Sequence, residues 1–134
     1  MRDLSRYCSI PFRDMGPGWD GCDCWGLVLL FYKTELGIDL QSHGGEYAGV
    51  KDMASITKIA EAERKKWSVV DPPGMPGDVV EMPLLRRGFH VGVVAAPGLI
   101  LHIEENGFAR VVPEKSFRVA SRIKRYWRYN AGLR

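Results

Sequence analysis

Residues 21–38 read GCDCWGLVLLFYKTELGI, and this stretch decides the fold class of the chain. Apolar side chains recur at three- and four-residue intervals after Asp23, and Gly37 provides a typical C-terminal stop. Pro and Gly are dense in the preceding residues 7–21, which predicts an irregular loop there. The sequence therefore predicts a buried helix over residues 23–36 that begins directly after a glycine-rich loop.

The rest of the chain predicts one more helix and then a series of strands. A polar helix with a narrow apolar stripe is expected over residues 52–67. Short β-like runs separated by Gly, Pro or Asn follow at residues 78–82, 90–95, 99–104, 108–112 and 118–127. Helices followed by closely spaced strands predict an α+β domain, with an antiparallel sheet packed on the first helix. The strands have no helical crossovers between them, which argues against a doubly wound parallel sheet.

Length and composition limit the protein class. The chain has 134 residues, of which 46% are hydrophobic, so we expect a single domain over residues 1–134. A formal charge of +3 is too mild an excess to indicate a nucleic-acid partner. The longest apolar run, residues 27–32, is too short to span a membrane, and the charged first residues do not resemble a signal peptide. We therefore expect synthesis and retention in the cytoplasm.

Cys24 is the candidate nucleophile, because it lies where the glycine-rich loop becomes a helix. The unpaired amides and the positive dipole end of a first helical turn stabilise a thiolate. Such positions can lower the pKa of a thiol from about 8.5 to roughly 3.5 to 7.5. The sequence therefore predicts a lowered pKa for Cys24, and the same amides could hold an oxyanion. Cys8 and Cys22 are interpreted as structural thiols.

Two histidines in the predicted strands are candidates for the base that a nucleophilic thiol requires. If Ala96, Pro97 and Gly98 form a three-residue hairpin loop, Gly92 lies opposite His102. His90 and His102 then share one face as a diagonal pair roughly 7 to 8 Å apart. A two-residue loop would place them on opposite faces. The apolar residues that alternate with His102 indicate a core on one face of the strand and a site on the other.

An alternative use of these side chains is a small zinc site. Cys22, Cys24 and the histidines are all residue types that bind zinc. A Cys-x-Cys pair lacks the usual spacing of two to four residues between zinc ligands, which disfavours this interpretation. His43 stands beside Gly44 and Gly45 in a predicted loop and is interpreted as structural.

The candidate nucleophile lies within a recognisable pattern. The run GCDCWGLV at residues 21–28 resembles the nucleophile motif of the NlpC family of cell-wall cysteine peptidases, in which an Asp-Cys-small-Gly-Leu-Val string opens the helix. The runs PGDVV at residues 76–80 and HVGVV at residues 90–94, followed by His102, resemble the strands that bear the base and a third polar residue. The resemblance covers residues 7–103 in the order of the family.

The resemblance implies a papain-like fold and a role for each matching residue. Cys24 matches the nucleophile, His90 the general base, and His102 the residue that orients the imidazole of the base. Tyr7 matches a tyrosine that helps to line the oxyanion site, and Asp23 matches the residue that shapes the turn before the nucleophile. The implied reaction is acyl transfer to Cys24 followed by hydrolysis, with no metal and no cofactor.

The resemblance also implies a substrate and partners. Family members hydrolyse amide bonds in peptidoglycan stem peptides. Trp25, in place of the usual small residue after the nucleophile, is similar to a branch found with phage tail genes. The implied role is a tail-associated cell-wall hydrolase, delivered to the cell wall in a phage tail and in contact with other tail proteins. The alternative is a structural tail assembly or tail-tip component whose hydrolase site is weak or silent.

Overall fold

The computed structural model describes residues 3–16, 18–43, 46, 49, 52–82 and 90–130. Its helical elements are η1 (Ser5–Ser9), α1 (Cys24–Phe31), the π-helical turn η2 (Tyr32–Leu36), α2 (Met53–Glu63), η3 (Arg64–Lys66) and α3 (Phe117–Ala120). Its strands are β1 (Trp67–Val70), β2 (Val79–Glu81), β3 (Val91–Ala96), β4 (Leu99–His102), β5 (Arg110–Pro113) and β6 (Arg125–Tyr129). None of the described helices has the length and apolar character needed to cross a membrane.

The helix predicted over residues 23–36 is confirmed as α1 continued by η2. Asp23 is the N-cap of α1, and its carboxylate accepts a hydrogen bond of 2.8 Å from the backbone amide of Gly26. This bond satisfies one of the amides that a helix start leaves without a partner. The helical segment ends at Gly37, whose φ of 67° suits a residue without a side chain.

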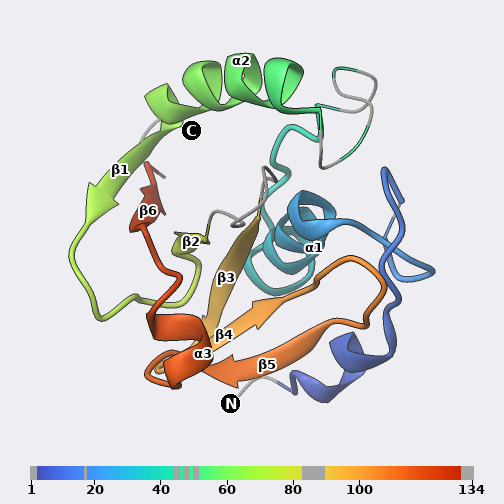
Figure 1. Cartoon of the computed structure of the whole chain (residues 1–134), viewed down its shortest axis with the longest axis vertical. Helices are drawn as coiled ribbons and strands as arrows, with labels where there is room; N and C mark the ends of the chain where they lie inside the picture. The colour runs from blue at the N-terminus through green and yellow to red at the C-terminus, as the bar shows by residue number, and fades with distance from the viewer. Residues whose placement is uncertain are drawn as a thin grey trace.

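The described strands form one antiparallel sheet in the order β1-β6-β2-β3-β4-β5. Helix α1 packs against β3 near the middle of this sheet, whereas α2 runs along the rim of the molecule and leads into β1 (Figure 1). The arrangement confirms the predicted α+β class, with the helix that begins at Cys24 packed against an antiparallel sheet.

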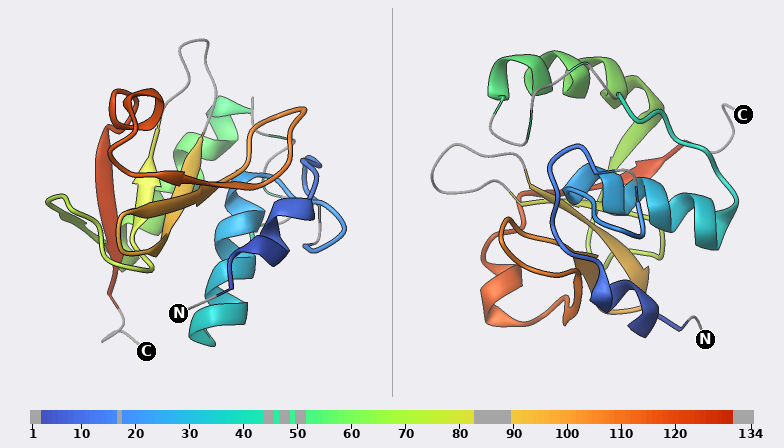
Figure 2. Two further views of the ribbon diagram at one scale, coloured as in Figure 1. Left: turned by 90° about the horizontal axis from the view of Figure 1, so that it is seen from below. Right: turned by 90° about the vertical axis from the view of Figure 1, so that its right-hand side faces the viewer.

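Apolar side chains pack on both faces of the sheet. On one face, Val93 and Leu101 join the cluster that contains Phe31 of α1. On the other face, the neighbouring residues Val94 and Ile100 pack with residues of α3 and β6. The ribbons of α1 and α3 lie on opposite sides of β3 and β4 (Figure 2). The expectation of a core on one face only is therefore wrong, and the face that carries His102 is also a packed face.

Two secondary-structure predictions need correction. The helix expected over residues 52–67 ends earlier, and Trp67 instead starts β1, which pairs with β6 through Trp67 and Tyr129. The strand expected over residues 118–127 begins as the short helix α3, and only β6 is extended. Residues 108–112 and 78–82 were expected as strands, and the structure has β5 and β2 there with shifted bounds.

Candidate active site

Cys24 is the first residue of α1 and is only 2% exposed. Burial, together with the nearby carboxylate of Asp23, raises the pKa of its thiol to about 12. The backbone amides of Val91, Trp25 and Cys24 itself act in the opposite direction and stabilise the thiolate. The predicted lowering of this pKa is therefore wrong for the structure, because desolvation outweighs the helix N-terminus. Because the backbone amide of Val91 hydrogen bonds to the Cys24 sulfur, this sulfur lies beside the start of β3.

His90 and His102 meet in a direct hydrogen bond. The Nε2 atom of His90 lies 3.0 Å from the Nδ1 atom of His102, and the two ring centroids are 5.2 Å apart. His90 immediately precedes β3 and is 4% exposed, while His102 ends β4 and is 3% exposed. Because the Nε2 atom of His90 makes this contact with His102, the Nδ1 atom of His90 is not part of it.

The predicted register places these histidines correctly, although the turn differs from the one expected. Val93 pairs with Leu101, a register that sets Gly92 opposite His102 as predicted. The turn itself contains only Pro97 and Gly98, and a β-bulge between Val94 and Ala96 supplies the additional residue. The bulge thus keeps both histidines on one face.

Gly92 allows the close approach of the two strands at this point. A Cβ atom on Gly92 would lie 3.1 Å from the Cβ atom of His102 and 3.0 Å from a methyl carbon of Ile100. A side chain there would push β4 away from β3. Glycine is therefore the residue that lets His102 sit near His90.

Both histidines are held in the neutral form. Burial lowers the pKa of His90 to about 4, helped by the nearby His102 and Arg122 and opposed by Glu104. Burial likewise lowers the pKa of His102 to about 4, with Glu104 again opposing. At neutral pH the described site thus holds an uncharged thiol and uncharged imidazoles.

Glu104 and Arg122 adjoin the histidine pair, and sequence reasoning did not identify either. The Oε1 atom of Glu104 lies 4.0 Å from His90 Nε2 and 3.8 Å from His102 Nδ1. Arg122 donates a hydrogen bond of 2.6 Å to that same oxygen. Burial opposes a charge on Glu104, but Arg122 outweighs it, so the pKa of Glu104 is lowered.

The remaining predicted site residues lie in different places. Asp23 shapes the helix start as its N-cap, with a further long contact of 3.4 Å from the amide of Met15. Tyr7 is fully buried, and its hydroxyl donates a hydrogen bond of 2.6 Å to Glu35. Glu35 lies in η2, at the other end of the helical segment from Cys24. The Tyr7 hydroxyl is therefore directed to Glu35 and away from the thiol of Cys24.

None of the three cysteines forms a disulfide. Cys8 is exposed, whereas Cys22 is buried, and burial raises the pKa of its thiol to about 12. Among the described residues, the group of side chains close enough to hold a metal ion is His90, His102 and Glu104, without a cysteine. The alternative zinc site built on Cys22 and Cys24 is therefore not assembled.

A cavity of about 410 Å³ lies next to the histidine pair. His90 and Trp25 line it on one side, Ile56 of α2 on another, and Trp67 and Trp127 contribute from the sheet. Its lining is mainly apolar and aromatic, which is typical of ligand pockets in proteins.

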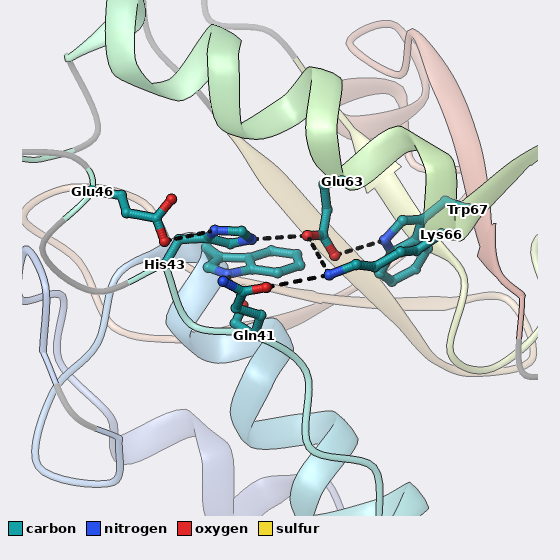
Figure 3. A network of polar contacts seen from close by, with 7 residues as sticks. Gln41, His43, Glu46, Glu63, Lys66 and Trp67 are labelled. Carbon is teal, nitrogen blue, oxygen red and sulfur yellow. Dashed lines mark hydrogen bonds and ion pairs between the residues drawn. The ribbon is translucent and has the colours of Figure 1, made fainter. Parts of the chain in front are cut away.

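One wall of this cavity is held by a network of polar contacts centred on His43 (Figure 3). The ring nitrogens of His43 lie 3.2 Å from a Glu46 oxygen and 2.8 Å from a Glu63 oxygen. Glu63 also accepts a hydrogen bond of 3.1 Å from the Trp67 indole. These contacts tie the segment that follows α1 to α2, which supports the structural interpretation of His43.

The fold belongs to a recognisable class: a cysteine-bearing helix packed on an antiparallel sheet is the papain-like α+β architecture. The model of the NlpC/P60 family matches residues 9–130, and the chain belongs to this family. Membership suggests a cell-wall peptidase, since the family generally comprises cysteine peptidases and amidases. No curated protein matches the sequence.

Two solved structures share the fold at low sequence identity. One is a Staphylococcus aureus protein described as similar to lipoprotein, NLP/P60 family, with a TM-score of 0.57, 15% identity and 92% of this chain covered. The other is a Bacillus cereus NlpC/P60 family protein, with a TM-score of 0.51, 17% identity and 83% of this chain covered. The chain spans only 37% and 32% of these two proteins.

Proposed function

We propose that this protein is a cysteine peptidase that hydrolyses amide bonds in peptidoglycan stem peptides, with Cys24 as nucleophile and His90 as base. The observation that carries the proposal is the hydrogen-bonded pair of His90 and His102 at the start of β3, beside the helix that begins at Cys24. Membership of the NlpC/P60 family supports both the reaction class and the cell-wall substrate.

The proposed reaction begins with transfer of the Cys24 proton to Nδ1 of His90 as the sulfur attacks the scissile carbonyl. His90 then carries protons on both nitrogens, and its Nε2–H donates to Nδ1 of His102 across the 3.0 Å contact. His102 thereby keeps the ring oriented. The protonated His90 gives its proton to the leaving amine, and a water molecule, activated by His90, hydrolyses the thioester.

The charges that develop in this step have identifiable partners. The amides of Cys24 and Trp25 at the start of α1 are suited to hold the oxyanion of the tetrahedral intermediate. Glu104 favours the imidazolium form of His90, whereas Arg122 disfavours it. A proton that moves during attack avoids a separate buried thiolate, whose formation the raised pKa of Cys24 makes costly.

The apolar cavity beside His90 is the proposed binding cleft for the substrate segment next to the scissile bond. It adjoins the base and is bordered by Trp25, the residue directly after the nucleophile. Convergence of a cavity with groups whose pKa values are strongly shifted is typical of an active site.

We further propose that the protein acts with a phage tail, as the similarity around Trp25 implies. The second candidate function is a structural tail component with a weak or silent site. Specific support for that alternative comes from the burial of Cys24, which is 2% exposed and has a raised thiol pKa. The two candidates differ in whether the purified chain cleaves peptidoglycan.

The test is incubation of the purified chain with peptidoglycan sacculi, followed by mass spectrometry of the released muropeptides. Hydrolysis is expected with the unaltered chain and with Cys8→Ala, which removes an exposed thiol. The Cys24→Ala variant should release no fragments. If the unaltered chain, folded by circular dichroism, releases no more than Cys24→Ala, the peptidase proposal is wrong and the structural role is favoured.

A further inference from the structure

Glu104 brings a third metal-binding type of side chain to the histidine pair. The three atoms concerned are His90 Nε2, His102 Nδ1 and Glu104 Oε1, at separations of 3.0, 3.8 and 4.0 Å. Nitrogen from two imidazoles and oxygen from one carboxylate is a ligand set found in zinc sites. Arg122 hydrogen bonds to the Glu104 carboxylate. The proposed peptidase reaction does not require a metal at this position.

The spacing of these atoms fits a zinc ion. A triangle with these three sides has one point about 2.1 Å from each corner, and zinc binds nitrogen and oxygen ligands at about 2.0 to 2.2 Å. A zinc ion near this point would reach all three atoms after only small side-chain movements. At that point the ion lies in the plane of the three atoms, and small side-chain movements that bring it out of this plane would let a water molecule complete a tetrahedral set.

The surroundings provide rigidity on one side and access on the other. The two histidine side chains are each 3% exposed and are fixed by the sheet, whereas the Glu104 side chain is 32% exposed. An ion can therefore enter from the Glu104 side. We propose that His90, His102 and Glu104 form a binding site for Zn²⁺, and that the bound ion switches off the catalytic base.

The inhibitory effect follows from the position of the imidazole protons, and this part rests on the proposed peptidase function. Zinc needs the lone pair of His90 Nε2 and that of His102 Nδ1, so it replaces the hydrogen bond between them. The proton of neutral His90 must then reside on Nδ1. In that tautomer Nδ1 cannot accept the Cys24 proton, and the ring also loses its orienting bond to His102.

Arg122 sets the affinity of this site. Its guanidinium donates to the same Glu104 oxygen that zinc would use, at 2.6 Å, and its positive charge opposes a cation nearby. Arg110 adds positive charge close to His102. We therefore expect binding weaker than that of a structural zinc site, and tighter binding when Arg122 is neutralised.

The test is isothermal titration calorimetry of the full chain with ZnCl₂. One zinc ion per chain is expected, and Glu104→Gln should weaken binding at least about 10-fold, as should His102→Gln. Glu105→Gln is the matched control, because it removes the same charge from the adjacent exposed residue and should bind as the unaltered chain does. Arg122→Gln should bind more tightly.

The Cys24→Ala variant separates this site from zinc capture by the nucleophile. Retained affinity in that variant supports the proposal, whereas loss of binding overturns it. Equal affinity in Glu104→Gln and Glu105→Gln would also overturn it. Because calorimetry does not depend on hydrolysis, the result stands even if the chain proves inactive on peptidoglycan. If the chain is active, inhibition should require less zinc in Arg122→Gln and be reversed by EDTA.

Discussion

Two buried histidine sites in this chain differ in the partners of their ring nitrogens. His43 faces carboxylate oxygens with both nitrogens, at 3.2 Å from Glu46 and 2.8 Å from Glu63. His90 instead faces His102 at 3.0 Å, and its Nε2 atom lies 4.0 Å from the carboxylate of Glu104. Both histidines are nearly inaccessible to solvent, so burial alone does not distinguish them.

The partners of its ring nitrogens decide whether a buried histidine is suited to proton transfer. A ring that contacts a carboxylate through each nitrogen serves to connect two segments. His43 in this way connects the segment that follows η2 to Glu63 at the end of α2 (Figure 3). A ring paired through one nitrogen with another neutral ring is oriented by that contact, and its other nitrogen faces a different direction. His90 belongs to this second kind, which suits a general base.

The first prediction tests this distinction through activity. His90→Gln should lower kcat for muropeptide hydrolysis by roughly 10²- to 10⁴-fold, the range typical for removal of a general base. His43→Gln should leave kcat within a few-fold of the unaltered chain and act mainly on KM, because His43 lines the proposed binding cleft but takes no part in proton transfer. The measurement is steady-state kinetics on a purified muropeptide. Similar kcat losses in the two folded variants would remove the distinction.

The second prediction concerns the pH dependence of stability at the histidine pair. Burial lowers the pKa of His90 and His102 to about 4 in the folded chain, below the ordinary value of 6.5. The unfolded chain therefore binds more protons between these values, so stability is complete above pH 6.5 and is lost as pH falls through 4. At about 1.4 kcal/mol for each pKa unit, the two rings together should lower the free energy of unfolding by several kcal/mol between pH 6.5 and 4.

Urea unfolding at pH 7, 5.5 and 4.5 measures this dependence. The variant His102→Gln removes one of the two titrating rings but keeps a side chain that can hydrogen bond to His90. Its free energy of unfolding should fall less steeply with pH than that of the unaltered chain. An unchanged slope in His102→Gln would contradict a neutral, buried pair as the source of the effect.

The sequence was sufficient for the features that depend on local patterns. Apolar spacing after Asp23 predicts the helix that presents Cys24, and strand alternation with an assumed three-residue loop predicts the shared face of His90 and His102. The hairpin between β3 and β4 has the predicted register, but its turn differs from the predicted one. A β-bulge before Ala96 took the place of a third loop residue, and a bulge has little local signature.

Features created by distant parts of the chain could not be predicted in this way. Strand β1 pairs with β6, which lies far along the chain, and the sequence placed Trp67 at the end of a helix and predicted no strand after it. Glu104 and Arg122 meet only after β4 and α3 have packed. The raised pKa of Cys24 depends on how completely the fold covers the thiol, and no motif records that burial.

The third prediction measures the structural histidine through its two carboxylate partners. Glu63 is 12% exposed and accepts bonds from both His43 and Trp67, whereas Glu46 is 51% exposed and contacts His43. Burial opposes the charge on Glu63, but the hydrogen bonds from Trp67 and His43 outweigh it and lower its pKa. The two carboxylates should therefore differ in their contribution to stability.

Glu63→Gln should lower the free energy of unfolding by about 1–2 kcal/mol, because the amide keeps one hydrogen bond but loses the charge beside a buried imidazole. Glu46→Gln is the matched control and should change it by less than about 0.5 kcal/mol, as is usual for exposed ion pairs. Urea denaturation at pH 7 measures both. Equal decreases in the free energy of unfolding for the two variants would mean that His43 does not depend on its buried partner Glu63. The attachment of the segment around His43 to α2 would then rely on apolar packing around Trp25 and Trp67 instead.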